Sequence, residues 1–235
     1  MHLSPWSERA RWALDHHRVP YVKKTYTPMI SEPALRLKLK RLGGRVTVPI
    51  FIDGELVLRD SFDIARHADL HGAGATLFPD SHQGDIASLS AAIEPALHAA
   101  RALVTRRTAA SSDAKRDALP GPAWAKPALS PLATLGVRYF QRKYDTDAHT
   151  ASDDIGTIRA AAVRVRELLG GRDTIYESFS YADILAAGVV YTIEPPADNW
   201  LPMSAASRDV RTTPELFDEF ADLRAWRDAL YDAHR

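Results

Sequence analysis

The residues with the clearest chemical potential stand near the start of the chain, where residues 4–7 read Ser-Pro-Trp-Ser. Ser7 is predicted to be the N-cap of a helix, because a serine hydroxyl can accept hydrogen bonds from the orphan amides of a first turn. Ser4 then lies in the loop just before that helix, near amides that point outward and carry partial positive charge. An anion, a thiolate included, is stabilised at such a place. The same pattern is also common in a plain loop followed by a cap, so the motif alone leaves both interpretations open.

A second unusual position is Pro49, which stands inside the apolar run of residues 46–52. The run is otherwise typical of a strand, but proline cannot donate to a ladder and is normally excluded from central strands. Two interpretations follow: an edge-strand proline that serves no ligand, or a cis proline that shapes a binding turn, since cis bonds are rare elsewhere. The run ends at Asp53-Gly54, which is typical of a tight hairpin turn.

Two further serines are predicted to begin helices. Ser61 follows Asp60, and as an N-cap its hydroxyl can satisfy one end-amide while its own amide stays available. Ser180 and Asp183 form an S-x-x-D capping box in front of an apolar run.

The pattern of predicted elements changes at the Gly- and Ala-rich segment 72–80, which is typical of a linker. Before it we expect helices over 7–17, 34–42 and 61–71, and strands over 21–26, 46–52 and 56–58. After it we expect helices over 85–107, 133–145, 152–169, 180–192 and 214–234, with loops that include 111–131 and 194–213. The helical spacing of four apolar residues predicts one buried face on the first helix: Trp6, Ala10, Ala13 and Leu14.

The composition excludes several classes of protein. Hydrophobic residues make up 46% and charged residues 26% of the 235 residues, which is ordinary for a globular protein. Thirty basic residues balance thirty acidic ones, so no charge surplus favours nucleic acid or an anionic membrane as a partner. The chain has no cysteine, which excludes disulfides, thiolate metal sites and cysteine nucleophiles. No apolar run approaches a membrane span or a signal-peptide core, so we expect a cytoplasmic protein.

One pattern could suggest a metal. Asp63, His67 and His71 recur every four residues and so share a helix face. The sequence suggests no further ligand, and such spacing usually marks a solvated face. We therefore expect no metal site.

The four motifs, in register, resemble those of serine-type bacterial glutathione transferases. The resemblance implies that Ser4 donates a hydrogen bond to the thiolate of glutathione. It implies a cis Pro49 whose turn leaves the backbone of Val48 free to pair with the cysteinyl unit. It also implies that Ser61 takes the γ-glutamyl carboxylate and that Asp60 neighbours the ammonium group.

The resemblance also implies a two-domain fold: an α/β thioredoxin-like domain over 1–75 and an all-helical domain over 84–235. The capping box of Ser180 and Asp183 opens a core helix of the helical domain in that family, where its role is in folding. The family's first strand has no counterpart here, because residues 1–3 are too few for a strand and a turn. Either the translation start lies upstream, or the sheet has a gap whose unpaired backbone groups cost about 1–3 kcal/mol each when buried.

The function implied is attack of the glutathione thiolate on a small electrophile, with glutathione as substrate and no metal. A homodimer is also implied. The alternative is a non-catalytic protein of the same fold that binds a ligand or a partner, and the short N-terminus favours it.

Overall fold

The computed structural model describes residues 3–27, 31–39, 43–44, 46–119, 135–136, 138–139, 141–142 and 150–235. The chain divides into two compact units. The first unit contains Met1–Ala91, Leu169–Gly188 and Leu230–Arg235, and the second contains Ala92–Leu168 and Val189–Ala229. The domain borders expected from the sequence, 1–75 and 84–235, stay predictions.

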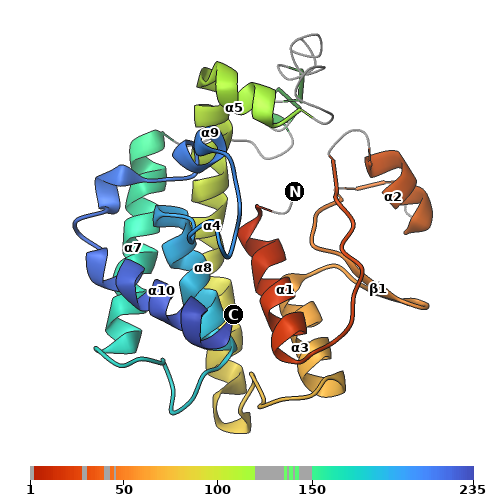
Figure 1. Ribbon diagram of the computed structural model, residues 1–235, viewed down its shortest axis with the longest axis vertical. Helices are drawn as coiled ribbons and strands as arrows, with labels where there is room; N and C mark the ends of the chain where they lie inside the picture. Colours follow the sequence, from red (N-terminus) through yellow and green to blue (C-terminus); the bar gives the residue numbers. More distant parts are fainter. Residues whose placement is uncertain are drawn as a thin grey trace. The chain divides into compact units, whose positions relative to one another are not determined.

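In the first unit, helices α1 and α3 lie side by side and a short hairpin follows the α2 region (Figure 1). Strands β1 and β2 of the hairpin are antiparallel, with Ile52 opposite Val57. The elements of this part are α1 (Pro5–His16), α2 (Glu32–Lys38), β1 (Phe51–Asp53), β2 (Leu56–Leu58) and α3 (Ser61–His71). The helix-strand alternation expected for this part is present only in part, because no strand lies between α1 and α2 in the described residues.

The buried face of α1 centres on Trp12, which is 1% exposed. Its ring packs 4.4 Å from that of Tyr231, and its Nε1–H donates to the carbonyl of His234 over 2.9 Å. Ala10, Ala13 and Leu14 are buried as predicted. The sequence pattern placed Trp6 on the same face, but Trp6 is only half-buried. The buried face of α1 is therefore centred on Trp12 and not on Trp6.

Three predictions for this unit need correction. Residues 21–26 form no strand, because within the described chain no neighbouring strand pairs with them. The run 46–52 becomes a strand only at Phe51, after the proline that cannot join a ladder. The hairpin loop is Gly54-Glu55, one residue later than predicted, since Asp53 still pairs with Leu56. Gly54 takes φ +56°, which suits the first position of a type II′ turn.

The helix expected over 34–42 is α2, which starts two residues earlier and ends at Lys38. Pro33 lies in its first turn, where a missing N–H does no harm. Residues 40–42 of the prediction lie outside the described residues. The predicted helix over 61–71 is confirmed to the residue as α3.

The remaining elements are helical, as expected. They are η1 (Asp80–His82), α4 (Gln83–Ala110), α5 (Ser112–Asp117), α7 (Ala151–Leu169), α8 (Tyr181–Ile193), α9 (Ala205–Asp209), η2 (Pro214–Leu216) and α10 (Ala221–His234). The predicted loops 111–131 and 194–213 contain the short helices α5 and α9, each capped by a serine side chain. The helix predicted over 214–234 is split, because α10 begins only at Ala221. Most of the helix predicted over 133–145 lies outside the described residues.

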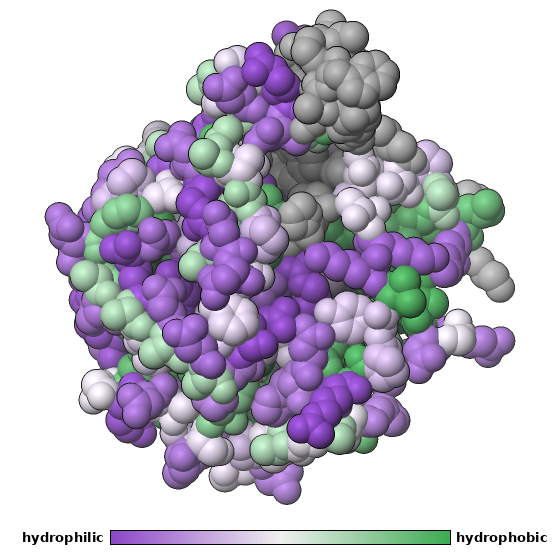
Figure 2. Space-filling model, in the orientation of Figure 1, coloured by the Kyte–Doolittle hydropathy of each residue, from purple (hydrophilic) through white to green (hydrophobic). Residues whose placement is uncertain are grey.

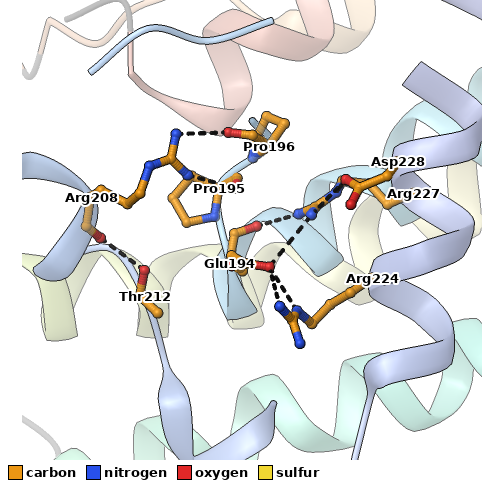
Figure 3. A network of polar contacts seen from close by, with 8 residues as sticks. All are labelled: Glu194, Pro195, Pro196, Arg208, Thr212, Arg224, Arg227 and Asp228. Carbon is orange, nitrogen blue, oxygen red and sulfur yellow. Dashed lines mark hydrogen bonds and ion pairs between the residues drawn. The ribbon is translucent and has the colours of Figure 1, made fainter. Parts of the chain in front are cut away.

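In the second unit, arginine side chains donate hydrogen bonds to the carbonyl groups of the residues just after α8 (Figure 3). Arg227, 1% exposed, donates to the carbonyl of Glu194, whose carboxylate also accepts from Arg224 over 2.7 Å. Arg208 donates to the carbonyls of Pro195 and Pro196, over 3.0 Å each. These carbonyls belong to the residues that follow α8, and cations near a helix C-terminus also oppose its negative dipole end. The network thereby holds the turn that follows α8.

The face seen in Figure 2 is mainly hydrophilic, with hydrophobic residues scattered over it. No helix in the described part of the chain is long and apolar enough to cross a membrane. Among the residues that the structure describes, six large hydrophobic side chains are exposed: Val22, Leu37, Leu56, Leu70, Leu135 and Val163.

Candidate functional site

Ser4 is the N-cap of α1, and this corrects the prediction that Ser7 caps the helix. Its carbonyl accepts from the amide of Glu8 over 2.9 Å, while its backbone is extended (φ −89°, ψ 130°). The helix begins at Pro5 because proline suits the first helical position, where its missing N–H is not needed. Ser7 is therefore a residue of the first turn.

The hydroxyl of Ser4 makes no capping hydrogen bond to α1. The residue is 9% exposed and stands directly at the positive end of the helix dipole. An N-cap side chain normally accepts from one of the first-turn amides. Here the hydroxyl is not used as a cap, and it stands beside amides that attract an anion.

Val48 and Pro49 lie just before β1, and the peptide bond between them is cis. The cis bond expected from the sequence is thus present. Both side chains are half-buried, whereas Val46 is 3% exposed and anchors the segment in the core. The backbone of Val48 is outside the described ladder of β1 and β2, as a docking role would require.

Asp60, not Ser61, is the N-cap of α3. Its Oδ1 accepts from the amide of Phe62 over 2.7 Å, and its carbonyl accepts from Ile64 over 3.0 Å. The carboxylate caps the helix because aspartate is as good an N-cap as serine and also opposes the positive dipole end. Ser61 becomes the first helical residue and is 4% exposed, while Asp60 is exposed.

The predicted capping box at Ser180 is centred on the carboxylate of Asp183. Its Oδ2 accepts from the amide of Ser180 over 2.8 Å and from the Ser180 hydroxyl over 3.0 Å. The Oδ1 atom accepts from the amide of Ile175 over 2.8 Å, a partner that sequence spacing could not reveal. Burial raises the pKa of Asp183 above its ordinary value, although these three hydrogen bonds act in the opposite direction.

Two charged residues of α1, Glu8 and Arg9, are buried, which the sequence pattern did not predict. Glu8 is 4% exposed and pairs with Arg11 and, over 3.1 Å, with Arg235. Arg9, 2% exposed, lies over Gly188 of α8, where an added Cβ would stand 2.8 Å from the Arg9 Nε atom. A helical pattern does not distinguish a buried guanidinium from a solvated one, so this burial left no sign in the sequence.

The two histidines of α3 lie against each other and against an aromatic ring. The rings of His67 and His71 lie 4.4 Å apart, and that of Phe51 lies 5.5 Å from His67. Burial, followed by the charge of His71, lowers the pKa of His67. Across the ranges that the structure describes, no group of three acidic or histidine side chains could hold a metal ion.

Comparisons with known proteins agree with this geometry. Residues 3–71 match the family model of the glutathione S-transferase N-terminal domain. The structure is similar to that of glutathione transferase GSTFuA3 from Phanerochaete chrysosporium, with a TM-score of 0.63 and 13% sequence identity over 99% of this chain and 91% of that chain. It is also similar to glutathione transferase GSTFuA2 from the same organism, with a TM-score of 0.62 and 16% identity over the same shares. No curated protein matches the sequence. The chain therefore has the glutathione transferase fold, a thioredoxin-like domain followed by a helical one.

Proposed function

We propose that this protein is a glutathione transferase, which joins the sulfur of glutathione to a small electrophile. The observation that carries the proposal is the placement of Ser4. It stands at the N-cap of α1 with a hydroxyl that makes no capping bond to the helix, within the segment that matches the family model. A hydroxyl and a helix N-terminus at one position are suited to holding a thiolate.

In the proposed reaction, Ser4 lowers the pKa of the bound thiol. A free thiol has a pKa of about 8.5 and is mostly protonated near neutral pH. A hydrogen bond donated by Ser4 to the charged form favours ionisation, and the dipole of α1 acts in the same direction. A shift of about two units corresponds to about 2.7 kcal/mol. The thiolate then attacks the electrophilic carbon, so that a C–S bond forms and the leaving group departs with the electron pair.

The rest of glutathione is proposed to bind through the backbone of Val48 and the start of α3. The cis bond at Pro49 and the absence of Val48 from the described ladder support strand-like pairing with the cysteinyl unit. At α3, the buried Ser61 can take the γ-glutamyl carboxylate through its hydroxyl and amide, near the positive end of the helix. The exposed carboxylate of Asp60 can face the ammonium group.

A second candidate is a non-catalytic protein of this fold that binds glutathione or another ligand. The burial of Ser4 and Ser61, which leaves 9% and 4% of these residues exposed, favours it, because hydroxyls with little access are harder for glutathione to reach. The proposal of a transferase extends to a homodimer, a cytoplasmic location and a role in detoxification, as the resemblance implies.

One experiment separates the candidates. Glutathione binding is measured by calorimetry, and conjugation to chlorodinitrobenzene, with loss of chloride, is followed by absorbance. Binding together with conjugation above the uncatalysed rate supports the transferase. Binding with no conjugation of this or other electrophiles supports the second candidate, and no binding at all overturns both.

A further inference from the structure

A closed chain of hydrogen bonds links the two ends of α3 through the first residue of α8. Near the C-terminal end of α3, Asp69 accepts from the amide of Leu77 over 2.6 Å and from the hydroxyl of Thr76 over 2.9 Å. The carbonyl of Leu77 in turn accepts from the amide of Tyr181 over 2.8 Å. The chain closes at the start of α3, where the Tyr181 hydroxyl donates to the carbonyl of Ser61 over 3.2 Å.

The side chain of Tyr181 is fully buried and is held by several contacts. It is 0% exposed, its ring stacks 5.0 Å from that of Phe78, and it meets the ring of Phe62 edge-on at 5.6 Å. Its backbone lies inside the capping box that Asp183 makes with the amide of Ser180. Aromatic contacts, a helix cap and two hydrogen bonds therefore orient its hydroxyl toward the carbonyl of Ser61.

We infer that Tyr181 is a positioning residue for glutathione, which it serves by holding Ser61 and the first turn of α3 in place. The inference rests on the proposed function, in which Ser61 takes the γ-glutamyl carboxylate. Carboxylate binding by a hydroxyl and an amide depends on their exact direction, since hydrogen bonds weaken steeply when they are misaligned. A carbonyl oxygen has two lone pairs, so Ser61 can accept from Tyr181 as well as within its helix.

The capping box of Ser180 and Asp183 then affects glutathione binding as well as folding, because it positions Tyr181. The box begins α8 at Tyr181, and the hydroxyl of that residue reaches a carbonyl 120 positions earlier in the chain. Tyr181 itself makes no contact with glutathione in this proposal. It acts on binding through α3 and leaves the sulfur chemistry at Ser4 unchanged.

The test is Tyr181→Phe, which keeps the ring and removes only the hydroxyl. We expect the dissociation constant of glutathione and its KM to rise roughly three- to tenfold, the effect of one hydrogen bond, with kcat unchanged. Tyr231→Phe is the matched control, because Tyr231 is equally buried, at 2%, and packs on Trp12 instead. The control should leave both constants unchanged, even where its melting temperature falls as much.

A double mutant supplies the second readout. If Tyr181 acts through Ser61, Tyr181→Phe should weaken glutathione binding less in a Ser61→Ala background than in the wild type. Equal affinity of Tyr181→Phe and the wild type, or fully additive effects in the double mutant, would overturn the inference alone. A wild type that does not bind glutathione would overturn the proposed function and this inference with it.

Discussion

The Nε2 atom of His17 lies 3.1 Å from Oδ1 of Asp69, although His17 is only 1% exposed. Its other ring nitrogen, Nδ1, lies 3.3 Å from the carbonyl of Ala73. Burial lowers the pKa of His17 and the charge of His16 lowers it further, while Asp69 opposes both. Nδ1 thus links the end of α1 to the segment after α3, while the lowered pKa disfavours the charged imidazole that an ion pair with Asp69 would require.

Acid should weaken this fold. The pKa of His17 is lowered below the unfolded value of about 6.5, so the unfolded chain binds the proton first as pH falls. Its contribution to the free energy of unfolding is complete above about pH 6.5 and is lost below it. Burial acts in the same direction on the pKa values of His67, His98 and His234. We expect urea titrations to show stability falling between about pH 7 and pH 5.

The contribution of His17 is isolated by His17→Gln, which cannot take up a proton. The variant should show a shallower loss of stability over the same interval. Parallel curves for variant and wild type would assign the pH dependence to the other groups. Asp183, whose pKa is raised, changes stability with the opposite sign and is common to both proteins.

Ser4→Ala should slow conjugation near neutral pH and move the pH–rate profile to higher pH, because the bound thiol loses a hydrogen bond to its charged form. Glutathione affinity should change little, since the peptide is held elsewhere. Thermal stability should also change little, because the Ser4 side chain makes no capping bond to α1. Ser7→Ala, in the first turn of the same helix, is the control and should leave the profile in place. A pH–rate profile unchanged by Ser4→Ala would show that the Ser4 hydroxyl takes no part in ionising the thiol.

Ser61→Ala should weaken glutathione binding by about 1–3 kcal/mol, the cost of a lost hydrogen bond to a charged group. This corresponds to a dissociation constant raised roughly 5- to 150-fold. The helix itself should persist, because Asp60 supplies the cap. Calorimetric titration measures the constant, and circular dichroism confirms that the fold is kept. An unaltered constant would remove Ser61 from the site.

Gly188→Ala should destabilise the protein by about 1–3 kcal/mol, the usual cost of overpacking a core. The added Cβ would lie 2.8 Å from Nε of Arg9, a side chain that is itself buried. Gly156→Ala is the matched control, since Gly156 also lies in a helix but has nothing within 4 Å of an added Cβ. There the change should stabilise the helix by up to about 1 kcal/mol. Equal melting temperatures for the two variants would contradict the close approach of Arg9.

Local patterns predicted local structure well and missed what depends on distant partners. The bounds of α3 followed from apolar spacing and an acidic-Ser start, which are both properties of neighbouring residues. The two N-caps were assigned one position or one turn too late. Pro5 suits the first position of α1, which makes Ser4 the cap, and Asp60 caps α3 as readily as serine would. The strand expected over 21–26 failed for a different reason, since a β-rich segment becomes a strand only beside a partner.

In the candidate site, too, features set by neighbouring residues could be predicted, and those set by distant residues could not. Ser4, Val48, Pro49 and the Asp60-Ser61 pair were proposed from motifs, and of these proposals the cis bond at Pro49 is confirmed. Tyr181 could not be found this way, because the bond from its hydroxyl to Ser61 joins residues 120 positions apart. Its only local sign was the capping box that begins its helix.

The first unit is assembled from three separate stretches of chain, and this bears on when it can fold during synthesis. Trp12 donates to the carbonyl of His234, and Ser61 receives the hydroxyl of Tyr181. A nascent chain on the ribosome holds the whole N-terminal stretch long before either partner has been made. The contacts of Trp12 with Tyr231 and His234 can form only after residue 234 has emerged from the exit tunnel, so the core that is translated first is among the last to be completed.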